Sequence, residues 1–359
     1  LFKQIIDKQE SDSNTMISPL STALALSMTY NGAAGNTQAA MQQTLSLEDL
    51  SAQQINKSYK ILMEALRIVD PQVTLEIANS IWYRSKFPVI QNFIDVNREY
   101  YEAEVKSMDF SDPGAVDHIN QWCADKTNDK IQKILEFIPP DVVMYLINAL
   151  YFNGTWKYEF DSSNTEKQPF YLEDGISEQV DMMQMEAEVN YLDNDFFQAV
   201  ELFYGRGNYS MVCLLPKSGL AVNDLISRMD DEKWNEWMNG FTKTKCRVGL
   251  PKFKFKYAKL LNEQLINMGM GIAFGSGANF SRMVTGGGVY ISRVLHKTFI
   301  EVDEKGTEAA AVTVVEIREI SSPDSPVTIT FNRPFVFVIR EVTTNTIVFI
   351  GKLVDPEQS

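Results

Sequence analysis

Residues 144–152 form a nearly uninterrupted apolar run, MYLINALYF, in which Asn148 is the one polar residue. A strand with one solvated face alternates apolar and polar residues, whereas a strand covered on both faces is apolar throughout. We therefore predict a central strand here, inside a sheet that is covered on both sides. An unpaired buried amide costs about 1–3 kcal/mol, so Asn148 needs hydrogen-bond partners.

Helices and strands are interspersed along the rest of the chain without the regular alternation of a doubly wound fold, which predicts the α+β class. Although 359 residues would suit two domains, no linker, composition shift or repeat divides the chain, so we expect a single domain over residues 1–359. The predicted helices cover residues 1–7, 18–31, 36–45, 112–135 and 260–269. The further predicted strands cover residues 75–83, 189–203, 209–215, 247–257, 327–331, 335–341 and 346–353.

The charge balance of the chain excludes several classes of partner. Its 33 lysines and arginines stand against 47 aspartates and glutamates, so the formal net charge is −14. Binding to nucleic acid and to anionic membranes relies on clusters of basic side chains, so we expect no nucleic-acid partner. Residues 56–70 also lack a basic stripe, so we expect no binding of heparin-like polyanions. No apolar run approaches the roughly 20 residues of a membrane span.

Histidine and cysteine are scarce, and although carboxylates are plentiful, no spacing singles out a catalytic or metal-binding pair. The sequence has two histidines, His118 and His296, and its three cysteines lie far apart without a CxxC pair. It contains no GxSxG, HExxH, P-loop or GxGxxG motif. We therefore expect no enzyme activity, no cofactor and no metal ion. We expect His118 on a helix surface or at a helix cap, and the pairing of the cysteines stays open.

The most unusual segment spans residues 301–326, EVDEKGTEAAAVTVVEIREISSPDSP. After Gly306 its residues alternate between an uncharged and a charged face, as in a half-buried strand. Small side chains would suit a strand that enters an already packed space, although composition alone favours an edge strand followed by a loop. The uncharged face consists of Thr307, Ala309, Ala311, Thr313, Val315 and Ile317. The opposite face consists of Glu308, Ala310, Val312, Val314, Glu316 and Arg318.

Seven short motifs stand in the order typical of one family, and over essentially its whole length the chain resembles the serpins. The resemblance implies a fold of about nine helices and three β-sheets, with an exposed reactive-centre loop at about residues 304–326. The motifs are Ser18-Pro19-Leu20-Ser21, residues 75–83, residues 122–131 (WCADKTNDKI), residues 148–160 (NALYFNGTWKYEF), Val294-Leu295-His296-Lys297, residues 303–311 (DEKGTEAAA), and residues 331–335 (FNRPF) with Phe349-Ile350-Gly351-Lys352.

The resemblance also implies a function. In inhibitory serpins a serine or cysteine protease cleaves the loop and becomes an acyl-enzyme, and the loop then enters the central sheet of the metastable fold as a new strand. This conformational change carries the protease along and distorts its active site. Residues 306–320 would form an inserted strand of about 50 Å at roughly 3.3 Å per residue, which is comparable to the diameter of a domain.

Individual residues carry over from the family pattern. The loop hinge would comprise Glu304, the acidic residue at the base of the loop, and then Gly306, Thr307, Glu308, Ala309, Ala310 and Ala311. Its small residues match inhibitory members, whereas non-inhibitory relatives tend to place bulky, charged or proline residues there. Trp156 matches the tryptophan at the top of the sheet where insertion starts, called the breach. The polar cluster beneath the sheet opening, called the shutter, would contain Ser18, Ser21, Asn148 and His296, with His296 as a structural hydrogen-bonding group.

The reactive bond has two candidates. The usual spacing from Glu304 leads to Ile320-Ser321, which would suit an elastase-like protease. Arg318-Glu319 would suit a trypsin-like protease, although an acidic residue after the cleaved bond is unfavourable for many such enzymes. Counting back from Phe331 leads instead to the vicinity of Pro323, so the loop is a few residues longer than usual.

Three functions remain to be compared. The leading hypothesis is a suicide inhibitor of serine, or else cysteine, proteases, with elastase-like targets ahead of trypsin-like ones. The second is a non-inhibitory serpin that acts as a carrier or chaperone, and the third is a conventional hydrolase. The resemblance implies a secreted or extracytoplasmic monomer. Residues 1–7 predict a helix and lack the features of a signal peptide, so we expect none in this sequence.

Overall fold

The computed structural model of the protein describes residues 1–8, 13–307 and 325–358. In it, the apolar run at residues 144–152 lies in strand β4 (Met144–Thr155), inside a six-stranded sheet. One face of the sheet packs on the main hydrophobic core, and the other packs on a smaller cluster around helix α6 (Ala115–Lys126). The predicted central strand is therefore confirmed. The sheet runs in the order β10 (Phe253–Leu260), β11 (Leu295–Asp303), β12 (Gly306–Thr307), β4, β2 (Val73–Arg84), β3 (Glu104–Met108).

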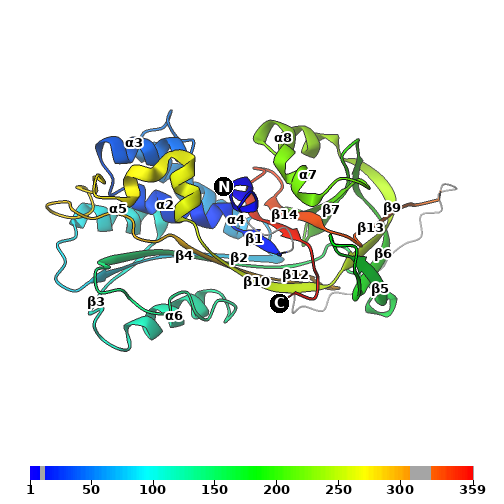
Figure 1. Cartoon of the computed structure of the whole chain (residues 1–359), viewed down its shortest axis with the longest axis horizontal. Coiled ribbons are helices and arrows are strands. Elements are labelled where there is room, and N and C mark those ends of the chain that lie inside the picture. Colours follow the sequence, from blue (N-terminus) through cyan, green and yellow to red (C-terminus); the bar gives the residue numbers. More distant parts are fainter. Residues whose placement is uncertain (9–12, 308–324, 359) are drawn as a thin grey trace.

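A second sheet of nine strands forms the other half of the structure (Figure 1). The resemblance implied three sheets, but hydrogen bonding among the described residues is continuous, because the long strand β6 pairs with three other strands. The path runs β1 (Thr15–Ile17), β15 (Ile347–Leu353), β14 (Phe335–Glu341), β8 (Tyr209–Pro216), β7 (Phe197–Tyr204), β6 (Ser177–Asp193), β9 (Thr242–Pro251), β13 (Val327–Thr330), with β5 (Glu166–Tyr171) on β6.

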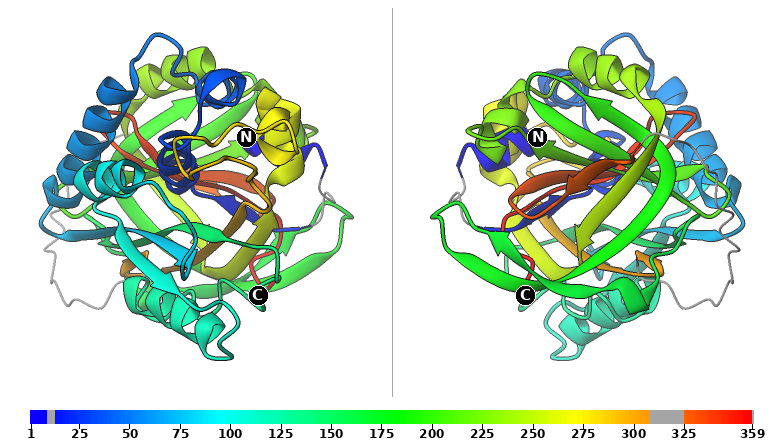
Figure 2. Two further views of the ribbon diagram at one scale, coloured as in Figure 1. Left: turned by 90° about the vertical axis from the view of Figure 1, so that its left-hand side faces the viewer. Right: turned by 90° about the vertical axis from the view of Figure 1, so that its right-hand side faces the viewer.

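The described residues contain nine α-helices, and with the two sheets they confirm the α+β class. Helix α6 covers one face of the six-stranded sheet, while α2, α3 and α5 lie on the opposite side (Figure 1), and the end views in Figure 2 show the sheets between these layers. The other helices are α1 (Phe2–Ile6), α2 (Pro19–Tyr30), α3 (Gly35–Thr44), α4 (Ala52–Ile68), α5 (Gln91–Tyr101), α7 (Val222–Arg228), α8 (Asp231–Gly240) and α9 (Asn262–Leu265), with short turns η1 (Ser162–Asn164), η2 (Ile266–Met270) and η3 (Gly271–Phe274).

Three predicted boundaries are wrong. The helix expected over residues 112–135 ends at Lys126, because Asn128 and Asp129 take positive φ angles of 48° and 61°. The strand expected over residues 189–203 is a hairpin of β6 and β7, and the one expected over residues 247–257 divides into β9 and β10. Helix α4 was not predicted, although the Ser51 and Gln54 capping box at its start is a recognisable signal.

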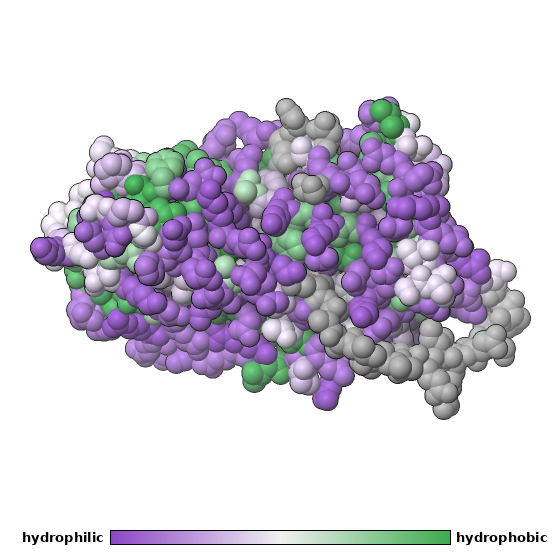
Figure 3. All heavy atoms as spheres, turned by 90° about the horizontal axis from the view of Figure 1, so that it is seen from below, coloured by the Kyte–Doolittle hydropathy of each residue, from purple (hydrophilic) through white to green (hydrophobic). Residues whose placement is uncertain are grey.

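The surface shows no apolar belt on the side seen in Figure 3, where hydrophilic residues predominate. Within the described ranges, none of the helices has both the length and the hydropathy required to cross a bilayer.

Candidate functional site

Gly306 and Thr307 form the two-residue strand β12, which pairs on one side with β11 and on the other with β4. Gly306 has φ of +154°, and a Cβ atom there would lie 2.1 Å from the carbonyl oxygen of Gly154, so the close approach to β4 requires glycine. Thr307 is buried, and its Oγ1 lies 2.5 Å from the hydroxyl of Tyr204. The start of the predicted loop thus already lies between two strands of the sheet.

Trp156 holds the turn that leads into β12. Its indole ring is buried and stacks on Tyr204, with 4.4 Å between ring centroids. The indole Nε1 donates to the carbonyl oxygen of Asp303 at 3.0 Å, and the Trp156 backbone N–H donates to the carbonyl oxygen of Lys305 at 2.8 Å. The structure therefore places Trp156 beside the base of the loop, as the family pattern implies.

Glu304 anchors the same turn by an ion pair. Its carboxylate accepts from Lys252 Nζ at 2.9 Å and from Thr165 Oγ1 at 2.8 Å. Burial opposes ionisation of Glu304, but the hydrogen bonds from Lys252 and Thr165, together with the lysine charge, outweigh it and lower the pKa of the carboxyl. The carboxylate is thus charged at neutral pH and fixes the position at which the loop leaves β11.

Ser18, Ser21 and His296 meet beneath the sheet, where β11 begins and helix α2 starts. The backbone N–H of Ser18 donates to His296 Nε2 at 3.0 Å, so Nε2 is the acceptor and the neutral ring carries its proton on Nδ1. The Ser21 N–H donates to Ser18 Oγ at 3.0 Å and so caps α2. Burial lowers the pKa of His296 to about 4. The ring is a neutral hydrogen-bonding group at neutral pH.

Asn148 meets a partner that the sequence did not suggest. It is half-buried, and its Nδ2 donates to Oδ1 of Asn79 at 2.9 Å rather than to the serines or to His296. Asn79 lies directly opposite Asn148 on β2 and donates to the carbonyl oxygen of Tyr101 at 2.7 Å. The Oδ1 atom of Asn148 is buried and has no hydrogen-bond partner within the described part of the chain.

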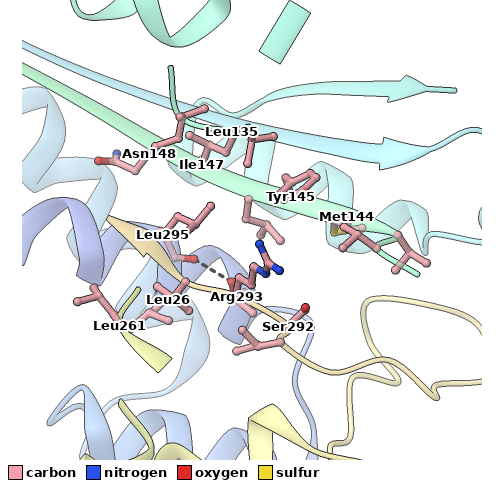
Figure 4. Close-up of a pocket in the computed structure, with 18 of the residues that line it drawn as sticks. Leu26, Leu135, Met144, Tyr145, Ile147, Asn148, Leu261, Ser292, Arg293 and Leu295 are labelled. Carbon is pink, nitrogen blue, oxygen red and sulfur yellow. Dashed lines mark hydrogen bonds between the residues drawn. The ribbon is translucent and has the colours of Figure 1, made fainter. Parts of the chain in front are cut away.

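A cavity of about 430 Å³ separates the first residues of β4 from the first residues of β11 (Figure 4). Among the residues that the structure describes, β12 is the strand that joins β4 and β11. Toward the beginnings of β4 and β11, no strand pairing connects the two. Ser21, Asn148 and His296 line the cavity together with apolar side chains. The predicted polar cluster is therefore gathered around one space, although its members do not all bond to one another.

Several predicted residues fall outside the described ranges. These are Glu308, Ala309, Ala310 and Ala311 of the hinge, and both candidate reactive bonds, Ile320-Ser321 and Arg318-Glu319.

Of the other residues singled out by their chemistry, Cys123 lines the cavity, whereas His118, Cys213 and Cys246 do not. His118 is exposed on α6 with its Nδ1 3.0 Å from the carbonyl oxygen of Gly114, which confirms a helix-surface position. Cys123, Cys213 and Cys246 are buried free thiols. Burial raises the pKa of Cys123 to about 12 and that of Cys246 to about 11, so neither is a ready nucleophile.

Comparisons with known proteins give a consistent result. The family described as Serpin (serine protease inhibitor) matches residues 1–356. The chain is 34% identical over 326 residues to an alpha-1-antitrypsin homolog of Cyprinus carpio, covering 90% of this chain and 87% of that protein. Among solved structures, the thermophilic serpin Tengpin in its native state superposes with a TM-score of 0.89 at 37% identity, covering 99% of this chain and 91% of that one. A thyroxine-binding globulin in complex with thyroxine superposes with a TM-score of 0.88 at 27% identity, covering 99% and 95%.

Proposed function

The chain belongs to the serpin family, and we propose that it is a suicide-substrate inhibitor of serine proteases, with cysteine proteases as a second target class. The observation that carries this proposal is the position of Gly306 and Thr307, which are paired between β11 and β4 above a space that no other described strand fills. A strand that continued from Thr307 would enter that space directly. The residues that follow Thr307 and Glu308 are three alanines, which are small enough to pass between packed strands.

The chemistry of the trap needs no catalytic group on this chain. The protease serine attacks the carbonyl carbon of the reactive bond, the peptide bond breaks, and the new amino terminus leaves with a proton. The loop is then held to the protease by an ester. Insertion of the loop as a strand adds backbone hydrogen bonds on both sides and moves the attached protease before water can hydrolyse the ester.

The register of β12 indicates where each inserted residue would lie. Thr307 is opposite Gly154 on β4 and Val302 on β11, and both pairings are antiparallel. Thr313 lies six residues after Thr307 in the loop. Asn148 lies six residues before Gly154 on β4, and His296 lies six residues before Val302 on β11. Opposite residues share a face of the sheet, so the Thr313 hydroxyl would lie on the inward face beside the unpaired Asn148 Oδ1. Thr313, the second threonine of the uncharged face, would thus meet the polar cluster.

The identity of the reactive bond is part of the proposal. We place it at Ile320-Ser321, which selects an elastase-like protease, with Arg318-Glu319 and a trypsin-like protease as the second choice. The protein would act as a secreted or extracytoplasmic monomer whose single domain spans residues 1–359. Its role is that of an inhibitor and not of an enzyme.

Incubation with pancreatic elastase and with trypsin tests the proposal. We expect an SDS-stable complex with one of them, and mass spectrometry of the released C-terminal peptide should identify the cleaved bond. Cleaved protein should melt at a much higher temperature than intact protein, because the loop has become a strand. Cleavage that produces neither a complex nor a stabilised product would overturn the inhibitor proposal.

A carrier or chaperone role is the alternative. It is supported by the likeness to thyroxine-binding globulin, which was solved in complex with thyroxine. The alanines after Thr307 and Glu308 argue against it, because a protein that never inserts its loop has no need of small side chains there. The incubation just described separates the two roles, since a pure carrier would be cleaved without trapping the protease.

A further inference from the structure

The cavity between β4 and β11 has the size and the walls of a small-molecule site. Its volume of about 430 Å³ lies within the range of roughly 300–1,000 Å³ that ligand pockets occupy. Protein interiors are otherwise close-packed, with few voids larger than a water molecule. The wall is mainly apolar and is drawn from α2, β4, the segment before β11 and β11 itself. It includes Leu26, Ile147, Leu261, Phe280, Met283 and Leu295.

Arg293 places a positive charge at the mouth of this cavity. The residue is exposed, and Figure 4 shows its guanidinium directed toward β4. The guanidinium lies 5.4 Å from the centre of the Phe137 ring. No carboxylate of the described residues lies within 4 Å of it, so its N–H donors have no acidic partner. An arginine of this kind favours a carboxylate, which it can bind through two parallel hydrogen bonds.

Of the other charged groups in the lining, Lys297 is engaged with a backbone carbonyl and Asp141 opposes the effect of Arg293. The ammonium of Lys297 donates to the carbonyl oxygen of Lys133 at 2.6 Å, and Asp141 is exposed at the rim and would repel an anion. The inner end of the cavity presents the acceptor Asn148 Oδ1 and the neutral ring of His296. A negative charge is therefore disfavoured inside the cavity, and at the mouth Arg293 is the group that favours it.

We propose that this cavity binds an amphiphilic monocarboxylate. The apolar body of the ligand fills the space between β4 and β11, and its carboxylate pairs with Arg293. This site is defined by the cavity and its charges and does not depend on protease inhibition.

Calorimetric titration of the intact protein with octanoate and with octanol tests the site. Both probes have the same tail, so the difference between their affinities measures the contribution of the carboxylate. We expect octanoate to bind at one site with a negative heat-capacity change, as burial of apolar surface requires, and octanol to bind about tenfold more weakly. Equal affinity for the two probes, or no saturable binding of octanoate, would overturn the proposal.

Two pairs of variants locate the binding. Arg293→Gln should weaken octanoate about tenfold, to the level of octanol, whereas Arg282→Gln, which removes an exposed arginine outside the cavity, should leave both affinities unchanged. Ala25→Leu should weaken both probes, because Ala25 lines the cavity. Ala23→Leu adds the same side chain to the same helix away from the cavity and should have no effect. Octanoate binding that is unaffected by both Arg293→Gln and Ala25→Leu would place the ligand elsewhere and refute the site.

A consequence follows if the proposed function is correct, since the ligand and the inserting loop would occupy the same space. Saturating octanoate should then lower the yield of the protease complex, and Arg293→Gln should remove this effect. Because binding is measured without protease, the two proposals fail separately. Binding without any change in complex yield would refute the competition, while absence of binding refutes the site whatever the inhibition assay gives.

Discussion

His296 illustrates how burial decides the role of a single side chain. An exposed histidine changes charge near neutral pH, but this ring is buried and accepts a hydrogen bond at Nε2 from the backbone of Ser18. Protonation of Nε2 would place two donors against each other in a site with no counter-charge, and burial accordingly lowers the pKa to about 4. In this structure His296 is a buried structural acceptor.

The lowered pKa of His296 predicts an acid-sensitive fold. The unfolded chain takes up a proton below about pH 6.5, whereas the folded protein does so near pH 4. The contribution of His296 to the free energy of unfolding is therefore fully present above pH 6.5 and is lost as the pH drops toward 4. This loss amounts to about 3 kcal/mol at most. Urea unfolding between pH 7 and about pH 4.5 should show a shallower loss in His296→Gln than in the unmodified protein.

The other histidine provides the control for this measurement. His118 is exposed on α6, and His118→Gln should keep the pH dependence of the unmodified protein. If His296→Gln lost stability over this range as steeply as the unmodified protein does, the neutral buried ring would not be the cause.

At the scale of elements, the short strand β12 matters most. It contributes two residues, yet it pairs with strands on both sides and places Thr307 in a buried position against Tyr204. The ends of β4 and β7 meet at the same place through the bridge between Trp156 and Tyr204. This junction of the two sheets sets the point from which a longer inserted strand would grow.

Under the proposed function, Thr307→Arg should give a protein that is cleaved by the protease without trapping it. A guanidinium at this buried position would lack a partner, and burying an unpaired charge costs several kcal/mol. The substituted residue would therefore leave the space between β11 and β4 in the intact protein, and insertion would have to begin by burying it. We expect the fraction of protease trapped as an SDS-stable complex to fall at least about tenfold, with cleavage retained. Thr74→Arg, at an exposed threonine of β2 in the same sheet, should trap protease normally. Undiminished trapping by Thr307→Arg would contradict insertion from this point.

Thr313→Val tests the register of the inserted strand. Valine keeps the shape of threonine but removes the hydroxyl that would reach Asn148 Oδ1, so the cleaved form should lose about 1–3 kcal/mol of stability. The intact protein should change little. Thr328→Val, at an exposed position of β13, is the matched control in the same assay. Equal stability of cleaved Thr313→Val and cleaved unmodified protein would show that the loop enters in a different register.

At the scale of the whole molecule, the net charge of −14 governs long-range association. Helix α4 carries Lys57, Lys60 and Arg67, but Glu64 lies among them and Arg67 pairs with Glu102. The surface thus offers no extended basic face on this helix.

We expect heparin to change the rate of protease trapping by less than about twofold, since counterion release needs several basic contacts. The double variant Gln53→Lys and Glu64→Lys would give α4 a basic face, and its trapping rate should rise with heparin and fall with added salt. Strong acceleration of the unmodified protein by heparin would show that another surface binds the polyanion.

Patterns local in the sequence were sufficient for some features of this protein. The alternation after Gly306 falls almost wholly outside the described residues and stays a prediction. The order of the family motifs indicated the family. The apolar run of β4 indicated a central strand, and the interspersed helical and strand patterns indicated the α+β class. They succeeded because side-chain period and backbone preference are properties of neighbouring residues. His296 and Trp156, by contrast, were identified through the resemblance to the family, because each lies in one of its motifs.

Only the tertiary structure decided which distant groups meet. Asn148 pairs with Asn79 because the register of β2 against β4 places them opposite each other, and a shift of one residue would have turned both to the other face. The segment after α6 turns back onto the helix, where the side chain of Asn120 accepts the N–H groups of Ile134 and Leu135. The cavity with Arg293 at its mouth results from the packing of segments far apart in the chain, and no local pattern encodes a space between strands.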